Sequence, residues 1–113
     1  MRYSKLTDQI KGADCKSFEN NVKKNYEKNY PGVLVVRFDH KNKMPDWLVS
    51  DPMYGVIAVE CKSYKSMKGI ERAIEKWKDN QPEQYHSFMR LKRSGMKVNV
   101  VFNLKDGTWV VNL

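Results

Sequence analysis

Asp46, Glu60 and Lys62 lie on either side of a predicted turn, at a spacing that can do chemistry. Two apolar runs rich in β-forming residues, Trp47–Ser50 and Val56–Cys61, separate the aspartate from the glutamate. The residues between the runs include the Asp, Pro and Gly typical of a turn, so the segment is predicted to form a β-hairpin. Side chains alternate between the two faces of a strand, and this alternation places all three ionisable groups on one face.

A turn centred on Met53 also predicts the cross-strand pairs, which are Ser50 with Val56, Leu48 with Ala58, and Asp46 with Glu60. Opposed residues have Cβ atoms about 5 Å apart, so two carboxylates placed there repel unless a cation lies between them. An oxygen-preferring ion such as Mg²⁺ suits this pair and can supply a water as the nucleophile. The lysine can hold that water or stabilise charge on an attacked phosphate. The simpler alternative is a solvated hairpin whose charged side chains lie at the surface and have no chemical role.

Composition limits the class of protein. The chain has 113 residues, of which 41% are apolar and 30% charged, as expected for one soluble globular domain over residues 1–113. No apolar run approaches the roughly 20 residues that cross a bilayer, and the start lacks a signal-peptide stretch, so we expect an intracellular protein without a membrane partner. Cys15 and Cys61 are too few for a disulfide framework. The net charge of +8 favours a polyanionic partner such as nucleic acid.

The order Pro45-Asp46, then Glu60-Cys61-Lys62, resembles the signature of the PD-(D/E)XK nuclease superfamily. The resemblance covers most of the chain and implies a mixed sheet flanked by helices that cleaves phosphodiesters with Mg²⁺, or with Mn²⁺ in its place. It implies that Asp46 and Glu60 bind the metal and that Lys62 positions the water. It also implies that Cys61 offers its backbone carbonyl to the metal, while its side chain points to the opposite, packed face.

Apolar periodicity predicts the elements around the hairpin. Phe18, Val22 and Tyr26 recur every four residues and predict a helix over Ala13–Tyr30. The polar stretch Met1–Lys11 shows little periodicity and is expected to be an arm or a short helix. The remaining predictions are a strand at Val33–Phe38, helices at Ile70–Lys78 and from Pro82 to Ser94, and strands at Lys97–Leu104 and Thr108–Leu113. The expected fold is therefore α/β, with about five strands in a mixed sheet and the order αβββααββ.

Glu19 is a further candidate for the site because it borders the apolar stripe of the first predicted helix. By position alone, it either complements the helix dipole or leans over the sheet. Lys11-Gly12 followed by Phe18-Glu19 is similar in kind to archaeal-type Holliday junction resolvases. That resemblance implies that Glu19 helps to position the metal, directly or through a water.

Gln81 and Gln84 flank the predicted restart of the helix at a proline. Gln84 lies four residues before Phe88, on the face expected to pack against the sheet, where a polar group needs a partner. It therefore caps the helix or serves the site. The spacing from Gln81 to Tyr85 is similar to RecB-like nucleases, whereas Gln84 followed by Phe88 is similar to the resolvases. The two alignments choose different glutamines, and both stay candidates.

Several lysines close to the predicted site in sequence, or in the basic N-terminal stretch, are candidate phosphate contacts or else simply solvated: Lys11, Lys41, Lys43, Lys65 and Lys68.

The leading hypothesis is a Mg²⁺-dependent, structure-selective DNA endonuclease resembling a Holliday junction resolvase. Such an enzyme is expected to act as a homodimer on branched DNA, with Trp109–Val111 or the helix around Trp77 as candidate interface. The alternatives are a RecB- or Cas4-like nuclease without junction preference and a non-catalytic nucleic-acid-binding module. The sequence leaves open the preferred DNA and the number of metal ions per site.

Overall fold

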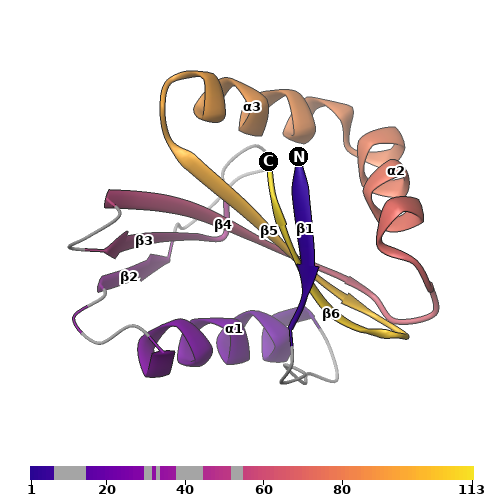
Figure 1. Cartoon of the computed structure of the whole chain (residues 1–113), viewed down its shortest axis with the longest axis horizontal. Coiled ribbons are helices and arrows are strands. Elements are labelled where there is room, and N and C mark those ends of the chain that lie inside the picture. The colour runs from indigo at the N-terminus through magenta and orange to yellow at the C-terminus, as the bar shows by residue number, and fades with distance from the viewer. Residues whose placement is uncertain (7–14, 30–31, 33, 38–44, 52–54) are drawn as a thin grey trace.

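A six-stranded sheet forms the centre of the computed structural model, which describes residues 1–6, 15–29, 32, 34–37, 45–51 and 55–113. In chain order the elements are β1 (Arg2–Lys5), α1 (Cys15–Asn29), β2 (Leu34–Arg37), β3 (Trp47–Asp51), β4 (Gly55–Tyr64), α2 (Ile70–Asn80), α3 (Pro82–Arg93), β5 (Lys97–Leu104) and β6 (Gly107–Asn112). Figure 1 shows α1 on one face of the sheet and α2 and α3 on the other. The predicted α/β class and order of elements are confirmed, with one strand added at the start.

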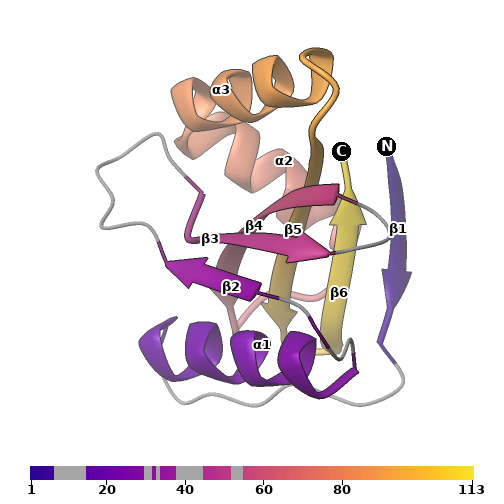
Figure 2. The same ribbon diagram turned by 90° about the vertical axis from the view of Figure 1, so that its left-hand side faces the viewer.

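The strands lie in the order β1-β6-β5-β4-β3-β2. β4 and β5 are parallel neighbours in the middle, and every other neighbouring pair is antiparallel. A parallel pair needs a long connection between its strands, which α2 and α3 provide. The view in Figure 2 places these two helices on the same side of the sheet, away from α1. The mixed sheet predicted from the sequence is thus built around the strand that carries Glu60 and Lys62.

β1 corrects the expectation of an arm or short helix at the start of the chain. Its residues pair with β6, from Arg2 opposite Asn112 to Lys5 opposite Trp109, and the two termini lie side by side in Figures 1 and 2. All four residues of β1 are exposed, so the strand has no alternation of apolar and polar residues to reveal it. Pairing with β1 satisfies backbone groups that β6 would otherwise leave at the sheet edge.

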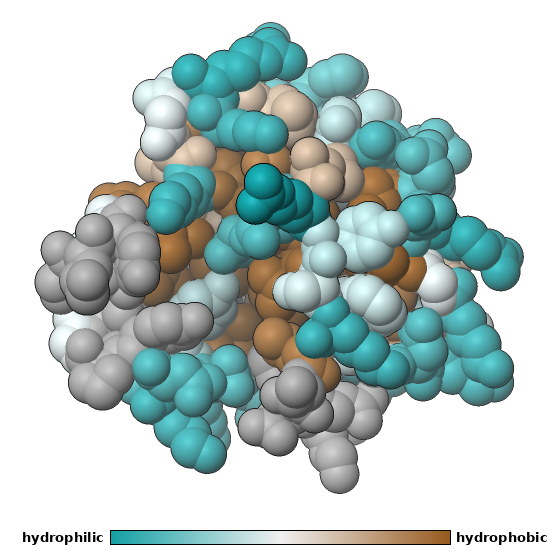
Figure 3. Space-filling view, in the orientation of Figure 1, coloured by the Kyte–Doolittle hydropathy of each residue, from teal (hydrophilic) through white to brown (hydrophobic). Residues whose placement is uncertain are grey.

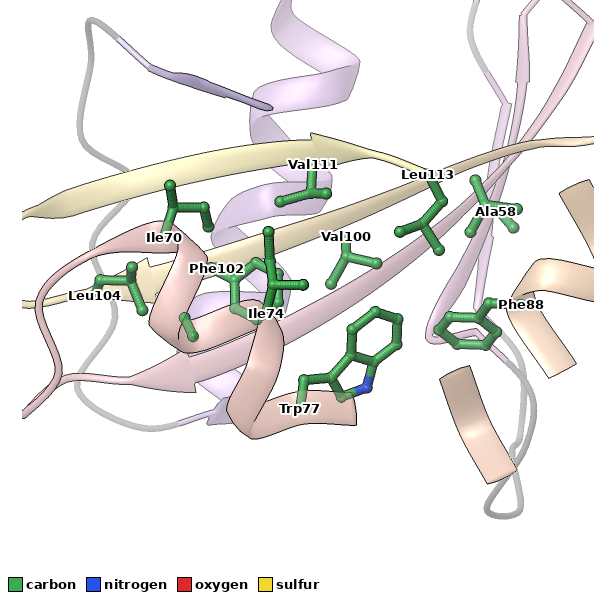
Figure 4. Packing of buried hydrophobic residues seen from close by; sticks show 12 residues of the cluster. Ala58, Ile70, Ile74, Trp77, Phe88, Val100, Phe102, Leu104, Val111 and Leu113 are labelled. Carbon is green, nitrogen blue, oxygen red and sulfur yellow. The ribbon is translucent and has the colours of Figure 1, made fainter. Parts of the chain in front are cut away.

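Two apolar layers hold the helices to the sheet. Phe18 and Val22 of α1 pack with Trp47, Val59 and other residues on one face. The layer on the other face joins α2, α3 and the strands, and Figure 4 shows members of it: Ala58, Ile70, Ile74, Trp77, Phe88, Val100, Phe102, Leu104, Val111 and Leu113. The central strands are therefore covered on both faces.

This packing changes the candidate dimer interface. Trp77 is fully buried among the residues of its own chain, so its side chain is not available to a second copy. β6 lies between β1 and β5, and Val111 is buried as well. The side chains of Trp77 and Val111 and the backbone edge of β6 are therefore not available to a second copy, while the homodimer and an interface on the helix around Trp77 or at Trp109–Val111 stay predictions.

The break between α2 and α3 falls where the proline predicts it. Pro82 is the first residue of α3, a position where its missing N–H costs nothing. Gln81 before it has φ −134° and ψ 59°, outside the helical region that a following proline disfavours. Its N–H still donates to the carbonyl of Trp77 at 2.8 Å, and its carbonyl accepts from Tyr85 at 3.1 Å. Because of this break, Gln81 and the first turn of α3 face β4.

In Figure 3, hydrophilic side chains form most of the rim of the visible face, and apolar side chains show between them nearer the centre.

Among the helices that the structure describes, none has the length and hydropathy that crossing a bilayer would require.

Candidate active site

The β3–β4 hairpin has the register that the sequence predicts. Ser50 lies opposite Val56 and Leu48 opposite Ala58, and the ladder ends with Trp47 opposite Val59. The chain bends at Asp46, immediately before this last pair. The predicted turn residues 52–54 lie outside the described part of the chain. Since the ladder fixes the register, Asp46 arrives beside Glu60.

Two hydrogen bonds join Asp46 to β4, one to the side chain of Glu60 and one to the backbone of Cys61. The backbone N–H of Asp46 donates to Oε1 of Glu60 at 3.1 Å, and the N–H of Cys61 donates to Oδ2 of Asp46 at 2.8 Å. Each carboxylate therefore accepts from the backbone of the opposite segment. Both residues are only 4% exposed. The two carboxylates are consequently fixed close together and largely shielded from water.

The second oxygen of Glu60 connects the hairpin to the α2–α3 break. Nζ of Lys62 lies 3.0 Å from Oε2 of Glu60 and donates to Oε1 of Gln81 at 2.6 Å. Nε2 of Gln84 donates to the same Oε2 at 3.1 Å. The two glutamines that the sequence could not separate thus have different partners, because Gln81 contacts the lysine and Gln84 contacts the glutamate.

The charge of Glu60 is poorly stabilised by the protein alone. Burial, followed by the negative charge of Asp46, raises the pKa of Glu60 from 4.5 to about 8, although the ammonium of Lys62 acts in the opposite direction. Ionising this carboxyl near neutral pH therefore costs free energy. A cation placed against the two carboxylates would remove that cost.

This raised pKa predicts that the metal-free protein loses stability as the pH rises. Between pH 4.5 and about 8, folded Glu60 holds a proton that the unfolded chain has released, so the free energy of unfolding falls across that window. A tenfold change in proton affinity corresponds to about 1.4 kcal/mol, so we expect a loss of the order of a few kcal/mol. Urea unfolding in chelator at several pH values measures it. A Glu60→Gln variant should lack this component, and equal pH dependence of the two proteins would contradict the prediction.

The donor set at this site fits a hard divalent cation. Mg²⁺ is usually bound through one or two carboxylates and completed by waters and substrate phosphates. In the described residues, no three side chains of His, Cys, Asp and Glu form a group arranged to hold a metal, so Asp46 and Glu60 stand as a carboxylate pair. Such a pair differs from the nitrogen and sulfur ligands of most zinc sites. Asp46 and Glu60 could therefore hold Mg²⁺ or Mn²⁺, and the binding of either ion stays a prediction.

Cys61 places its backbone and its side chain in different environments. Its N–H contacts Asp46, while its side chain belongs to the buried layer that contains Phe18 of α1. Burial and the nearby carboxylates raise the pKa of the Cys61 thiol well above its usual value, so the thiol stays protonated. The prediction that this side chain points to the packed face is confirmed, and metal binding by its carbonyl stays a prediction.

Glu19 lies on α1, half-buried, on the side of the sheet that Cys61 faces. Its charge contributes to the raised pKa of the Cys61 thiol, which places it near the strand that carries the site. The expectation that Glu19 leans over the sheet agrees with this position. Its action on the metal, directly or through a water, stays a prediction.

The candidate phosphate contacts divide into two groups. Lys65 and Lys68 are exposed in the segment that follows β4 and leads to α2. Lys11, Lys41 and Lys43 lie outside the described residues, as does Gly12. The structure therefore places two basic side chains shortly after the strand that carries Glu60 and Lys62.

Trp77 is a residue near the site that the sequence analysis did not connect with the site. Its indole N–H donates to Oε1 of Gln84 at 2.8 Å, inside the core. A buried indole needs an acceptor and a buried glutamine needs partners, so matching these two demands was possible from the sequence. The site thus continues from Glu60 through Gln84 into the core.

No protein-family model matches this chain, and no curated protein matches its sequence. Among solved structures, Hjc, a Holliday junction resolvase from the archaeal hyperthermophile Archaeoglobus fulgidus, is similar, with a TM-score of 0.57 and 14% sequence identity. The match covers 86% of this chain and 75% of the resolvase chain. The two chains share a fold. At this identity the likeness establishes the arrangement of strands and helices, and the chemistry rests on the geometry of the site itself.

Proposed function

We propose that this chain is a Mg²⁺-dependent DNA endonuclease that selects branched DNA, in the manner of a Holliday junction resolvase. The observation that carries the proposal is the cluster of Asp46, Glu60 and Lys62 at the β3–β4 hairpin. The carboxylate of Glu60 accepts from the backbone N–H of Asp46 at 3.1 Å and lies 3.0 Å from the ammonium of Lys62. The fold shared with Hjc and the net charge of +8 support a nucleic-acid substrate.

Each residue has a role that follows from its contacts. Asp46 and Glu60 would hold the cation, and Gln84 fixes the orientation of Glu60 by donating to it. When bound, the cation would polarise the scissile phosphate and lower the pKa of a nearby water. Lys62 is held by Gln81 with its ammonium beside Glu60, where it can orient the attacking water and stabilise the negative charge that develops on the phosphate.

Selection of branched DNA follows from size and charge. The described elements are occupied by the sheet and its covering helices, so recognition is expected to rest on phosphates and on DNA shape rather than on base edges. Exposed Lys65 and Lys68 are suited to such contacts, and binding should weaken strongly as salt rises. A homodimer would set two sites against two opposed strands.

A panel of DNAs tests the proposal. Four-way, flap, nicked, linear and single-stranded DNAs of matched sequence are incubated with the protein and Mg²⁺, and strand cleavage is measured. We expect the four-way junction to be bound more tightly than the linear duplex and cut about tenfold faster or more, with paired nicks on opposed strands. Excess chelator should abolish cutting, Mn²⁺ should restore it, and Zn²⁺ should not be needed.

Three results would contradict parts of this proposal. Undiminished cleavage in excess chelator would remove metal dependence. Binding without any cleavage would favour a non-catalytic nucleic-acid-binding module. Equal cutting of linear and branched DNA by a protein that sediments as a monomer would favour the second candidate, a RecB-like nuclease. The contact between Gln81 and Lys62 supports that candidate.

A further inference from the structure

We propose that Trp77 is a positioning residue of this site, which acts through Gln84 to fix how Glu60 is presented to the cation. The inference rests on the proposed function and assigns a role to a core residue that touches neither carboxylate. It concerns a continuous chain of side chains from the indole of Trp77, through the amide of Gln84, to the carboxylate of Glu60.

The chain is short, buried and complete. The indole nitrogen of Trp77 lies 2.8 Å from Oε1 of Gln84, and Nε2 of Gln84 lies 3.1 Å from Oε2 of Glu60. Trp77 is 0% exposed, Gln84 is 7% exposed and Glu60 is 4% exposed. Water therefore competes little for these hydrogen bonds, and each polar group depends on its neighbour in the chain.

The indole decides the orientation of the amide. A tryptophan ring nitrogen can only donate, so the group of Gln84 that faces Trp77 must be its carbonyl oxygen. The amide nitrogen of Gln84 then has to face Glu60, where it donates. The opposite orientation would place two donors against each other at Trp77 and two acceptors against each other at Glu60. Trp77 thus determines that Gln84 presents a donor to the carboxylate.

This donor helps to fix the rotation of the Glu60 carboxylate. Oε1 accepts from the backbone N–H of Asp46, while Oε2 accepts from Gln84 and lies beside the ammonium of Lys62. Partners on both oxygens hold the carboxylate plane in one orientation. Groups that orient a metal ligand in this way typically change metal affinity or activity about 10- to 100-fold when they are lost.

Trp77 itself packs against three aromatic rings. It packs against Tyr85 at 5.4 Å, Phe88 at 5.8 Å and Phe102 at 6.2 Å between ring centroids. Figure 4 shows the ring within the apolar layer, with its nitrogen on the side of Phe88. The Trp77→Phe variant would keep a smaller aromatic ring in this layer and lose the N–H donor. It therefore separates the packing role of Trp77 from its role as a hydrogen-bond donor to Gln84.

Trp109→Phe is the matched control. Trp109 lies on β6, and its ring nitrogen is buried without a hydrogen-bond partner among the described residues. Removing that N–H should change packing without affecting Glu60. The main readout is Mn²⁺ affinity, measured by calorimetry without DNA. We expect Trp77→Phe to weaken Mn²⁺ binding about tenfold, and Trp109→Phe to leave it within about twofold.

A double-mutant cycle distinguishes positioning from packing. If Trp77 acts through Gln84, then Trp77→Phe should weaken Mn²⁺ binding in the original protein and have little further effect in a Gln84→Met background. A purely structural role predicts equal losses in both backgrounds, and that result would overturn the inference. Unchanged Mn²⁺ affinity in Trp77→Phe would overturn it as well.

NMR spectroscopy tests the geometry independently of any metal or DNA. The side-chain amide protons of Gln84 should exchange slowly with solvent in the original protein and about tenfold faster or more in Trp77→Phe, because the amide then loses its fixed orientation. Unchanged exchange would overturn the inference. Failure of the unsubstituted protein to bind Mn²⁺ would instead refute the proposed function, so the two failures are distinguishable.

Discussion

Asp46→Asn is expected to reduce cleavage of a four-way junction by about a thousandfold or more, because it removes one of the two charges that would hold the cation. The asparagine oxygen can still accept from the N–H of Cys61, a contact of 2.8 Å in the structure, so the hairpin should keep its shape. The measurement is the single-turnover cleavage rate with saturating protein. DNA affinity, measured by a gel-shift titration in chelator, should be unchanged or slightly higher since a negative charge near the phosphate is lost.

Asp79→Asn provides the control for this prediction. Asp79 is exposed on α2, and the substitution removes the same charge from the protein without touching the hairpin. It should cut at close to the normal rate. If Asp46→Asn also cuts normally, then the carboxylate pair has only a structural role and the site lies elsewhere.

Lys62→Met is expected to reduce cleavage by about a hundredfold or more while weakening DNA binding only a little. Methionine keeps most of the aliphatic stem, so the variant mainly removes the ammonium that lies between Glu60 and Gln81. Loss of this charge should also raise the pKa of Glu60 further, since Lys62 is the group that lowers it. The cleavage rate should therefore need a higher pH or more Mg²⁺ than in the original protein.

The Gln81→Met variant tests how much of the effect of Lys62 on the cleavage rate depends on its orientation. It leaves the ammonium in place and removes the 2.6 Å contact that orients it, so we expect a loss of about tenfold, between the original protein and Lys62→Met. A Gln81→Met variant as inactive as Lys62→Met would mean that the glutamine does more than hold the lysine. Normal cleavage by Lys62→Met would remove the lysine from the mechanism.

The sequence alone predicted the hairpin and the position of its carboxylates correctly. Its apolar runs and turn residues select one register, because a shift by one residue would move Asp46 and Glu60 to opposite faces of the sheet. Pro82 likewise marked the start of α3, since a proline affects the residue before it and the first helical turn through local sterics. These features depend on residues close together in the chain, which is why a single sequence reveals them.

The tertiary structure decided features that depend on partners far apart in the chain. β1 forms because β6, more than a hundred residues later, offers a free edge, and the exposed side chains of β1 show no pattern that would indicate a strand. The sequence kept both glutamines as candidates, since they lie three residues apart at the same helix break. Their different partners, Lys62 and Glu60, lie on β4 and come within reach only because α2 and α3 pack onto the sheet through the apolar layer that contains Trp77 and Phe88.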